Sequence, residues 1–198
     1  LVKGASKGEG LGNQFLGHIR ETDAIVHVIR CFANDNIVHV NGKIDPLDDI
    51  DTINTELILA DLEAIEKAIS KMQKIAKADK SLKANLEILE EIRHSLEDGK
   101  AARTVALDDE AMTFMKSYNL LTAKPIIYVA NVSEDDVADE DNEYVKLVRD
   151  FAASENAECV QICADIESEL SELDAGERDA YLKELEIEES GLDKLIKA

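Results

Sequence analysis

Three short segments rich in β-branched residues alternate with helical patterns, and this alternation limits the chain to few folds. The segments cover residues 24–31, 125–131 and 158–163. The first is β-branched and nearly continuous in apolar residues, and the second is a buried strand that ends in a polar residue. Helical patterns occupy residues 11–21, 144–151 and 166–185. Strands that alternate with helices predict an α/β fold with a parallel sheet and helices on both faces.

A long helical pattern interrupts this alternation. Apolar residues recur at steps of four and three from Ile58 to Ala76, and a second stripe runs from Leu82 to Leu96. We expect Asp51 to cap the first helix, and a short polar break to separate the two. Two such stripes predict an antiparallel helical hairpin, a coiled coil, inserted at residues 51–118. The α/β domain would then comprise residues 1–50 and 119–198.

Charge and composition exclude several classes of protein. The chain has 43 acidic and 22 basic residues and a net charge of −21, so sequence-specific DNA binding through a broad basic face is excluded. No apolar run is long enough to span a membrane. The three cysteines lack the close pairs of a zinc or redox site. These features predict a cytoplasmic protein without a metal site of its own.

One local basic stripe stands out against the acidic background. Lysines recur along the expected first helix of the hairpin and at its tip, at positions 67, 71, 74, 77, 80 and 83. Such a row is either a solvated helix face or a binding surface for an RNA-bearing partner, because net charge does not exclude a local patch.

Ligands of parallel α/β sheets bind at the carboxyl ends of the strands, which directs attention to the residues that follow each strand. The second strand ends at Asn131, the first residue of the motif Asn131-Val132-Ser133-Glu134. P-loop GTPases have Asn-Lys-x-Asp at this position, where the aspartate accepts hydrogen bonds from guanine. Val132 in place of lysine, and the longer Glu134 in place of aspartate, should weaken guanine specificity. An ordinary turn is the alternative reading of this short motif.

Longer motifs resemble a known family. The run from Leu1 to Leu16 and the segment from Ile19 to Ile25 closely resemble the switch II region of Obg-related P-loop nucleotidases. Four further segments narrow the resemblance to the YchF family, the Obg-like ATPases: Arg30-Cys31-Phe32, Asn36-Ile37-Val38-His39-Val40, Asp45-Pro46 and Ile50-Asp51-Thr52-Ile53-Asn54-Thr55-Glu56-Leu57. The resemblance covers essentially the whole chain.

The resemblance implies an ATP-binding and ATP-hydrolysing switch protein that associates with the ribosome. Its sheet would be part of a P-loop nucleotidase domain. Family members also have a Gly-Lys-Ser phosphate-binding loop and an Asp-x-x-Gly motif before the position of Leu1, and a TGS domain after that of Ala198. The ligands of Mg²⁺ are therefore expected in the preceding segment, and this chain alone is not expected to hydrolyse ATP.

The resemblance also assigns roles to individual residues. Leu1 stands where Ras-like GTPases have the glutamine that orients the attacking water, and leucine cannot hydrogen-bond to water. His39 is the implied catalytic residue in its place; a surface or structural histidine is the alternative. The glycine-rich run, residues 4–12, would hinge a loop that senses the γ-phosphate, unless it is merely a tight surface loop. The implied adenine-site residues are Asn131, Val132, Glu134 and Ala164.

Two other functions remain open at this point. The first is a GTPase of the same fold, against which Val132 and Glu134 argue. The second is a non-catalytic interaction module in which the helical hairpin binds a partner.

Overall fold

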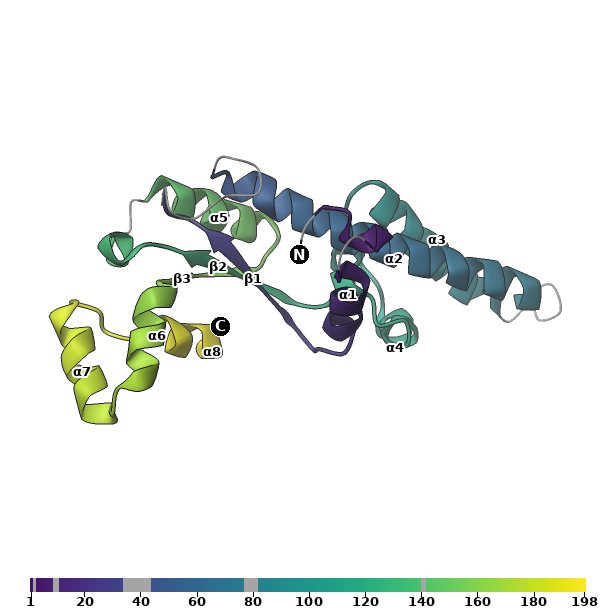
Figure 1. Cartoon of the computed structure of the whole chain (residues 1–198). Coiled ribbons are helices and arrows are strands. Elements are labelled where there is room, and N and C mark those ends of the chain that lie inside the picture. Colours follow the sequence, from purple (N-terminus) through teal and green to yellow (C-terminus); the bar gives the residue numbers. More distant parts are fainter. Residues whose placement is uncertain (2, 9–10, 34–43, 77–81, 140–141) are drawn as a thin grey trace. The chain divides into compact units, whose positions relative to one another are not determined.

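The computed structural model describes residues 1, 3–8, 11–33, 44–76, 82–139 and 142–198. The chain divides into two units, which are described separately: Leu1–Ile25 with Asp51–Pro125, and Val26–Ile50 with Ile126–Ala198. The elements, labelled in Figure 1, are η1 (Ala5–Lys7), α1 (Gly12–Arg20), β1 (Ile25–Arg30), α2 (Pro46–Ala76), α3 (Lys83–Glu97), η3 (Ala102–Thr104), α4 (Asp109–Lys116), η4 (Leu121–Ala123), β2 (Ile126–Asn131), η5 (Glu134–Asp136), α5 (Glu143–Ser154), β3 (Glu158–Ile162), α6 (Ala164–Glu172), α7 (Ala175–Glu184) and α8 (Gly191–Lys197).

The three strands form one sheet in the order β1-β2-β3. Strands β2 and β3 run parallel, with Val129 opposite Val160. Beyond the last residue of β1, the N–H of Cys31 donates to the carbonyl of Asn131 at 2.7 Å. The predicted α/β fold with a parallel sheet is therefore confirmed, and each strand lies within two residues of its predicted bounds.

Helices cover both faces of the sheet. Successive side chains of β2 point in opposite directions, so its apolar residues need a covering helix on each face. Val129 belongs to a core cluster that includes Leu195 of α8. The neighbouring Tyr128 is fully buried on the other face, where its ring meets that of Phe151 of α5 edge-on, 5.6 Å apart. Figure 1 shows α5 and α8 on opposite sides of the strands. This double burial explains why the β2 sequence is almost continuously apolar.

His27 of β1 is the one buried histidine within the described residues, with 9% of its surface exposed. Its ring lies 5.7 Å from that of Tyr128, and its Nδ1 has no hydrogen-bond partner in the described part of the chain. Burial lowers the pKa of His27 from 6.5 to about 4. The neutral imidazole is therefore built into the core.

Helix α2 begins earlier than the sequence pattern suggested. Asp45 caps it: the Asp45 carboxylate accepts a hydrogen bond from the N–H of Asp48 at 3.2 Å, and Pro46 is the first helical residue. Proline suits this position because its missing N–H would have no helical partner there. The prediction that Asp51 caps the helix is wrong, since Asp51 lies inside α2.

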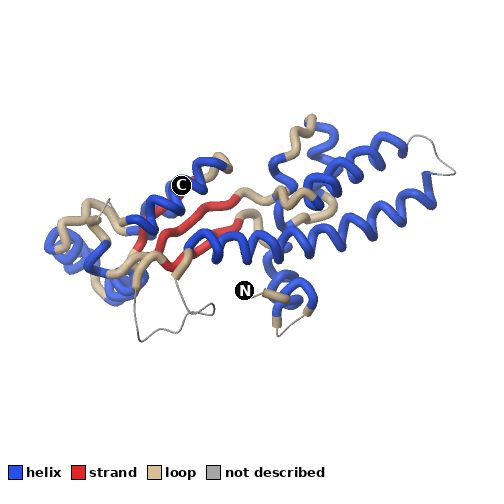
Figure 2. The backbone as a smooth tube through the Cα atoms, turned by 90° about the horizontal axis from the view of Figure 1, so that it is seen from above, coloured by secondary structure: helices blue, strands red, loops and turns tan. Residues whose placement is uncertain are grey.

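In the first unit, α2 and α3 lie side by side in both views (Figures 1 and 2). Apolar side chains from the two predicted stripes meet in one core cluster. Its buried members are Ile58, Ile65, Ile69, Leu89, Ile92, Leu96, Ala102, Met115 and Leu120. The spacing of seven and four along α2 places its three isoleucines on one face. Leu57, one position before Ile58, instead packs with Leu16 of α1 and Leu121 of η4.

A fully buried carboxylate, Asp61, joins three segments of this unit. It accepts hydrogen bonds from the N–H of Leu121 at 2.9 Å, and from the N–H and hydroxyl of Thr122 at 2.7 and 2.8 Å. The guanidinium of Arg20, at the end of α1, lies 3.1 Å away. Burial raises the pKa of the Asp61 carboxyl, and the hydrogen bonds from Thr122 and Leu121 oppose the rise.

Replacing Asp61 with alanine should destabilise the protein. The change leaves the buried N–H groups of Leu121 and Thr122 without acceptors and Arg20 without its partner. We expect the free energy of unfolding, measured in urea, to fall by about 3 kcal/mol. Glu63→Ala, an exposed change on the same helix, should cost less than about 0.5 kcal/mol. Equal effects of the two changes would contradict this role of Asp61.

The protein should lose stability in mild acid because of His27. Below pH 6.5 the unfolded chain binds a proton at this histidine, whereas the folded protein does not until about pH 4. Stability present above pH 6.5 is therefore lost as the pH falls to about 4, by about 3 kcal/mol in total. The free energy of unfolding, measured at several pH values across this range, should depend less on pH in His27→Phe than in wild type. The pH dependence should not change in His94→Gln, because His94 is exposed. An unchanged profile in His27→Phe would refute this cause.

Candidate functional site

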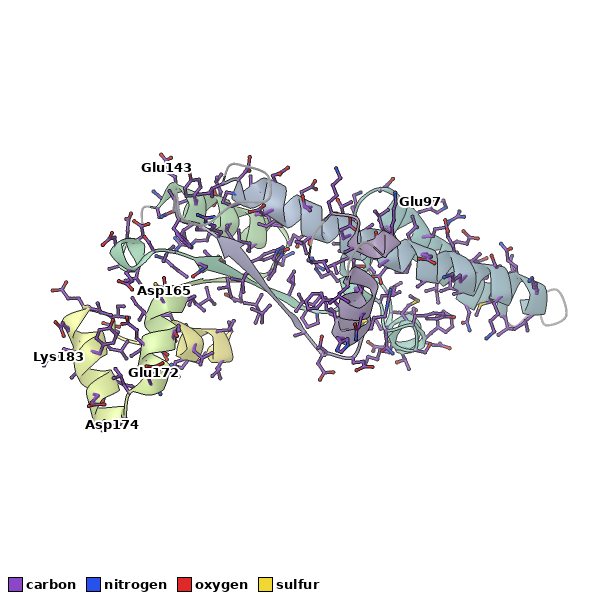
Figure 3. The ribbon with its side chains drawn as sticks, in the orientation of Figure 1. Glu97, Glu143, Asp165, Glu172, Asp174 and Lys183 are labelled. Carbon is purple, nitrogen blue, oxygen red and sulfur yellow. The ribbon has the colours of Figure 1, made fainter. Side chains whose placement is uncertain are left out.

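Polar residues gather where β2 and β3 end, at the carboxyl edge of the sheet. Strand β2 ends at Asn131, and the short helix η5 starts three residues later at Glu134. Strand β3 ends at Ile162, and α6 begins at Ala164. Figure 3 labels Asp165 near this start of α6. The parallel register brings both segments to the same edge, because Asn131 lies opposite Ile162.

A hydrogen bond joins two of the residues that the sequence placed in a base-binding site. The side-chain oxygen of Asn131 accepts a hydrogen bond from the N–H of Ala164 at 3.0 Å. This N–H belongs to the first turn of α6, where no helical carbonyl is available to it. Asn131 thus serves as a cap from another strand, since the preceding Cys163 makes no side-chain cap of its own. Its amide nitrogen faces away from this bond and can donate to another acceptor.

The other two predicted residues of this segment differ in exposure. The side chain of Val132 is buried, with 2% of its surface exposed, and its N–H donates to the carbonyl of Ile162 at 2.9 Å. Glu134 is exposed at the start of η5. Of the four implied base-site residues, Glu134 and Ala164 therefore present their side chains to solvent, Asn131 is half-buried, and Val132 belongs to the core.

Gln161, which no sequence motif pointed to, holds the acidic segment after Glu134. The amide nitrogen of Gln161, on β3, donates to three carbonyls of that segment: Asp136 at 3.0 Å, Val137 at 3.3 Å and Asp139 at 3.3 Å. The available signal was a polar residue between the two buried apolar residues Val160 and Ile162 of the strand. Gln161 shapes the loop beside the site without any charge of its own.

Cys163 lies beside this edge and is buried. Burial raises the pKa of its thiol, and the negative charges of Asp165 and Glu134 add to the rise. The thiol therefore stays protonated near neutral pH and is a poor nucleophile or metal ligand. A cleft of about 620 Å³ between β3, α6 and α8 is lined in part by Cys163 and Gln161, but not by Asn131, Glu134 or Ala164. The candidate site is thus the open edge of the sheet.

The remaining predicted site residues belong to other parts of the chain. His39, the implied catalytic residue, lies outside the described residues. Leu1 is partly exposed, at 38%. Among the described residues, no three His, Cys, Asp or Glu side chains lie close enough together to hold a metal ion. No helix in the described ranges has the length and apolar character to cross a membrane.

No protein-family model matches the chain. Individual proteins of known sequence are nevertheless similar to it. Over its full length it is 56% identical to the "Ribosome-binding ATPase YchF" of Bacillus subtilis and 58% identical to that of Haemophilus influenzae, covering 55% and 54% of those proteins.

A solved structure described as the Schizosaccharomyces pombe YchF GTPase is also similar. Its TM-score is 0.85 at 32% identity, over 96% of this chain and 52% of that one. The chain spans about half the length of the curated relatives it matches. Sequence identity over the entire chain and likeness of fold agree, and the chain belongs to the YchF family.

Proposed function

We propose that this chain is part of an ATP-hydrolysing switch protein and that its contribution is the reading of the base. The observation that carries the proposal is the pairing of Asn131 with the start of α6 at the carboxyl edge of the sheet. Asn131 fixes the Ala164 backbone beside itself and keeps an amide nitrogen free to donate. A purine ring nitrogen is a suitable acceptor for that group.

The glutamate at position 134 favours ATP over GTP as the nucleotide that is bound. Guanine recognition needs a carboxylate held close to two N–H donors on the edge of the base, and adenine has an acceptor nitrogen where guanine has its ring N–H. An exposed glutamate, longer than aspartate by one methylene, is poorly placed for the guanine edge. A carboxylate also repels an acceptor nitrogen, so adenine should be bound mainly through the Asn131 amide, beside the Ala164 backbone that Asn131 holds.

Hydrolysis requires groups that act on the phosphates. In this proposal the phosphate-binding loop, the Mg²⁺ ligands and a TGS domain belong to the other half of a protein as long as the curated relatives. His39 would position or activate the attacking water, since Leu1 cannot. Residues 1–50 and 119–198 would form the nucleotide-binding domain, with 51–118 as its inserted coiled coil.

A ribosome is the proposed partner, which implies a cytoplasmic protein. The named function of the bacterial relatives is one support. The other is the exposed lysine row on α2, of which Lys67, Lys71 and Lys74 lie in the described part. Lys67 is paired with Glu63, one turn away. A basic row on an acidic protein would confine RNA phosphate contacts to the arm formed by α2 and α3.

A GTPase is the second candidate function. The observation in its favour is the description of the similar S. pombe structure as a GTPase. The two candidates differ only in the base that Asn131 and Glu134 accept, so base preference discriminates between them.

Base preference should depend on Glu134. Titrating ATP and GTP, each with Mg²⁺, against a full-length protein that contains this chain should show ATP binding more tightly. Glu134→Asp should shift the ratio of the two dissociation constants about tenfold toward GTP. Asp135→Asn, an exposed neighbouring change, is the matched control. Val132→Lys is unsuitable, because it would place a charge in the core. A wild-type preference for GTP would instead establish the second candidate.

Turnover should depend on His39. In the full-length protein, His39→Ala should lower kcat by about a hundredfold and leave the ATP dissociation constant nearly unchanged, because general-base catalysis acts in the chemical step. His94→Ala, at an exposed position of α3, should change neither. Steady-state ATPase assays and nucleotide titrations measure both quantities. Full activity of His39→Ala would exclude the proposed catalytic role.

A further inference from the structure

A second buried carboxylate of α2 holds the glycine loop, defined here as residues 4–8. Glu56 has 3% of its surface exposed. One of its oxygens accepts a hydrogen bond from the N–H of Gly4 at 2.6 Å, and the other accepts one from the N–H of Ser6 at 2.8 Å. The two-point attachment fixes both the position and the orientation of the loop backbone on the helix.

The loop has a backbone shape that only certain residues permit. Gly4 and Gly8, which flank the helical turn η1, have φ angles of 90° and 87°. Such values are costly for residues with a side chain. Gly12, at the start of α1, packs so closely on Ala5 that an added Cβ would lie 2.6 Å from its Cα. The loop is therefore held by Glu56 on one side and packed closely against α1 on the other, which leaves its backbone little room to move.

The charge of Glu56 depends on the loop. Burial by itself raises the pKa of this carboxyl, but hydrogen bonds from Ser6 and Gly4 and the charge of Lys7 outweigh it and hold the pKa below its usual value. Glu56 is thus ionised at neutral pH. Departure of the loop would remove these donors from a buried charge, which is unfavourable. The contact consequently favours one defined loop position over a range of intermediate ones.

The following segment is attached to α2 as well. Arg20, at the end of α1, contacts Asp61 at 3.1 Å and also donates to the carbonyl of Ala60 at 3.1 Å. The chain from the glycine loop to the end of α1 is therefore bound to α2 at both ends, by carboxylates five positions apart.

We infer that Glu56 is a positioning residue for nucleotide hydrolysis: it holds the glycine loop on α2 in the arrangement that the chemical step requires. This inference rests on the proposed function, together with the role that the family resemblance implies for the glycine-rich run, residues 4–12, in sensing the γ-phosphate. Glu56 lies among the residues of the first unit, whereas Asn131 and Ala164 belong to the second. Its loss should therefore affect turnover and leave recognition of the base intact.

The test uses the full-length protein and compares kcat with the ATP dissociation constant. Glu56→Gln keeps the shape of the side chain, but its amide has one acceptor oxygen and places an N–H₂ against a backbone N–H. We expect kcat to fall about tenfold or more, because small displacements of reacting groups are costly, with the ATP dissociation constant within about twofold of wild type. Hydrogen exchange at Gly4 and Ser6 should accelerate in the same variant.

Two further variants complete the comparison. Glu63→Gln, an exposed change two turns along α2, should alter neither kcat nor exchange in the loop. Glu56→Asp keeps the charge but is one methylene shorter, so its kcat should lie between those of wild type and Glu56→Gln. If a thermal melt shows Glu56→Gln to be unfolded, Glu56→Asp supplies the same comparison.

The outcomes are distinguishable. A wild-type protein that hydrolyses ATP, with an unchanged kcat in Glu56→Gln, would overturn the inference and leave the proposed function standing. Equal losses of kcat and ATP affinity would assign Glu56 a general structural role and would also overturn it. A wild-type protein that binds no nucleotide would refute the proposed function itself, and the positioning role with it.

Discussion

The first unit depends on a buried negative charge and the donors that neutralise it. Asp61 has no exposed surface, and a bare carboxylate in such a place would be prohibitively unfavourable. One partner, Arg20, comes from α1. The other two, Leu121 and Thr122, come from η4, about sixty residues after Asp61 in the chain. Satisfying one charge thus requires α1, α2 and η4 to meet in a single arrangement, which apolar packing alone would specify less strictly.

Helix α2 combines this structural role with the proposed functional one. Its apolar face packs on α3, while Glu56 and Asp61 hold the glycine loop and the end of α1. This helix attaches the glycine loop through Glu56 and continues into the arm that it forms with α3. The proposed hydrolysis and ribosome binding would be linked through it.

Much of the fold was readable from the sequence, because its signals are periodic and local. Short segments that contain β-branched residues predicted the three strands, and the heptad spacing of Ile58, Ile65 and Ile69 predicted a buried helix face. Part of the candidate site followed as well, since Asn131 ends one predicted strand and Ala164 comes directly after another. The cap of α2 was misplaced because Asp45 and Asp51 carry the same local signal, and only the backbone path distinguishes them.

The sequence by itself determined the α/β class, the strand positions and the motif at the edge of the sheet, since these depend on residue type and spacing. Tertiary structure alone decided which polar groups meet: Glu56 with the glycine loop, Asp61 with η4, and Gln161 with the acidic segment. It also decided that Val132 is buried while Glu134 is exposed. The physical reason is that a buried charge or amide takes its partners from residues that are distant in sequence and adjacent only after folding.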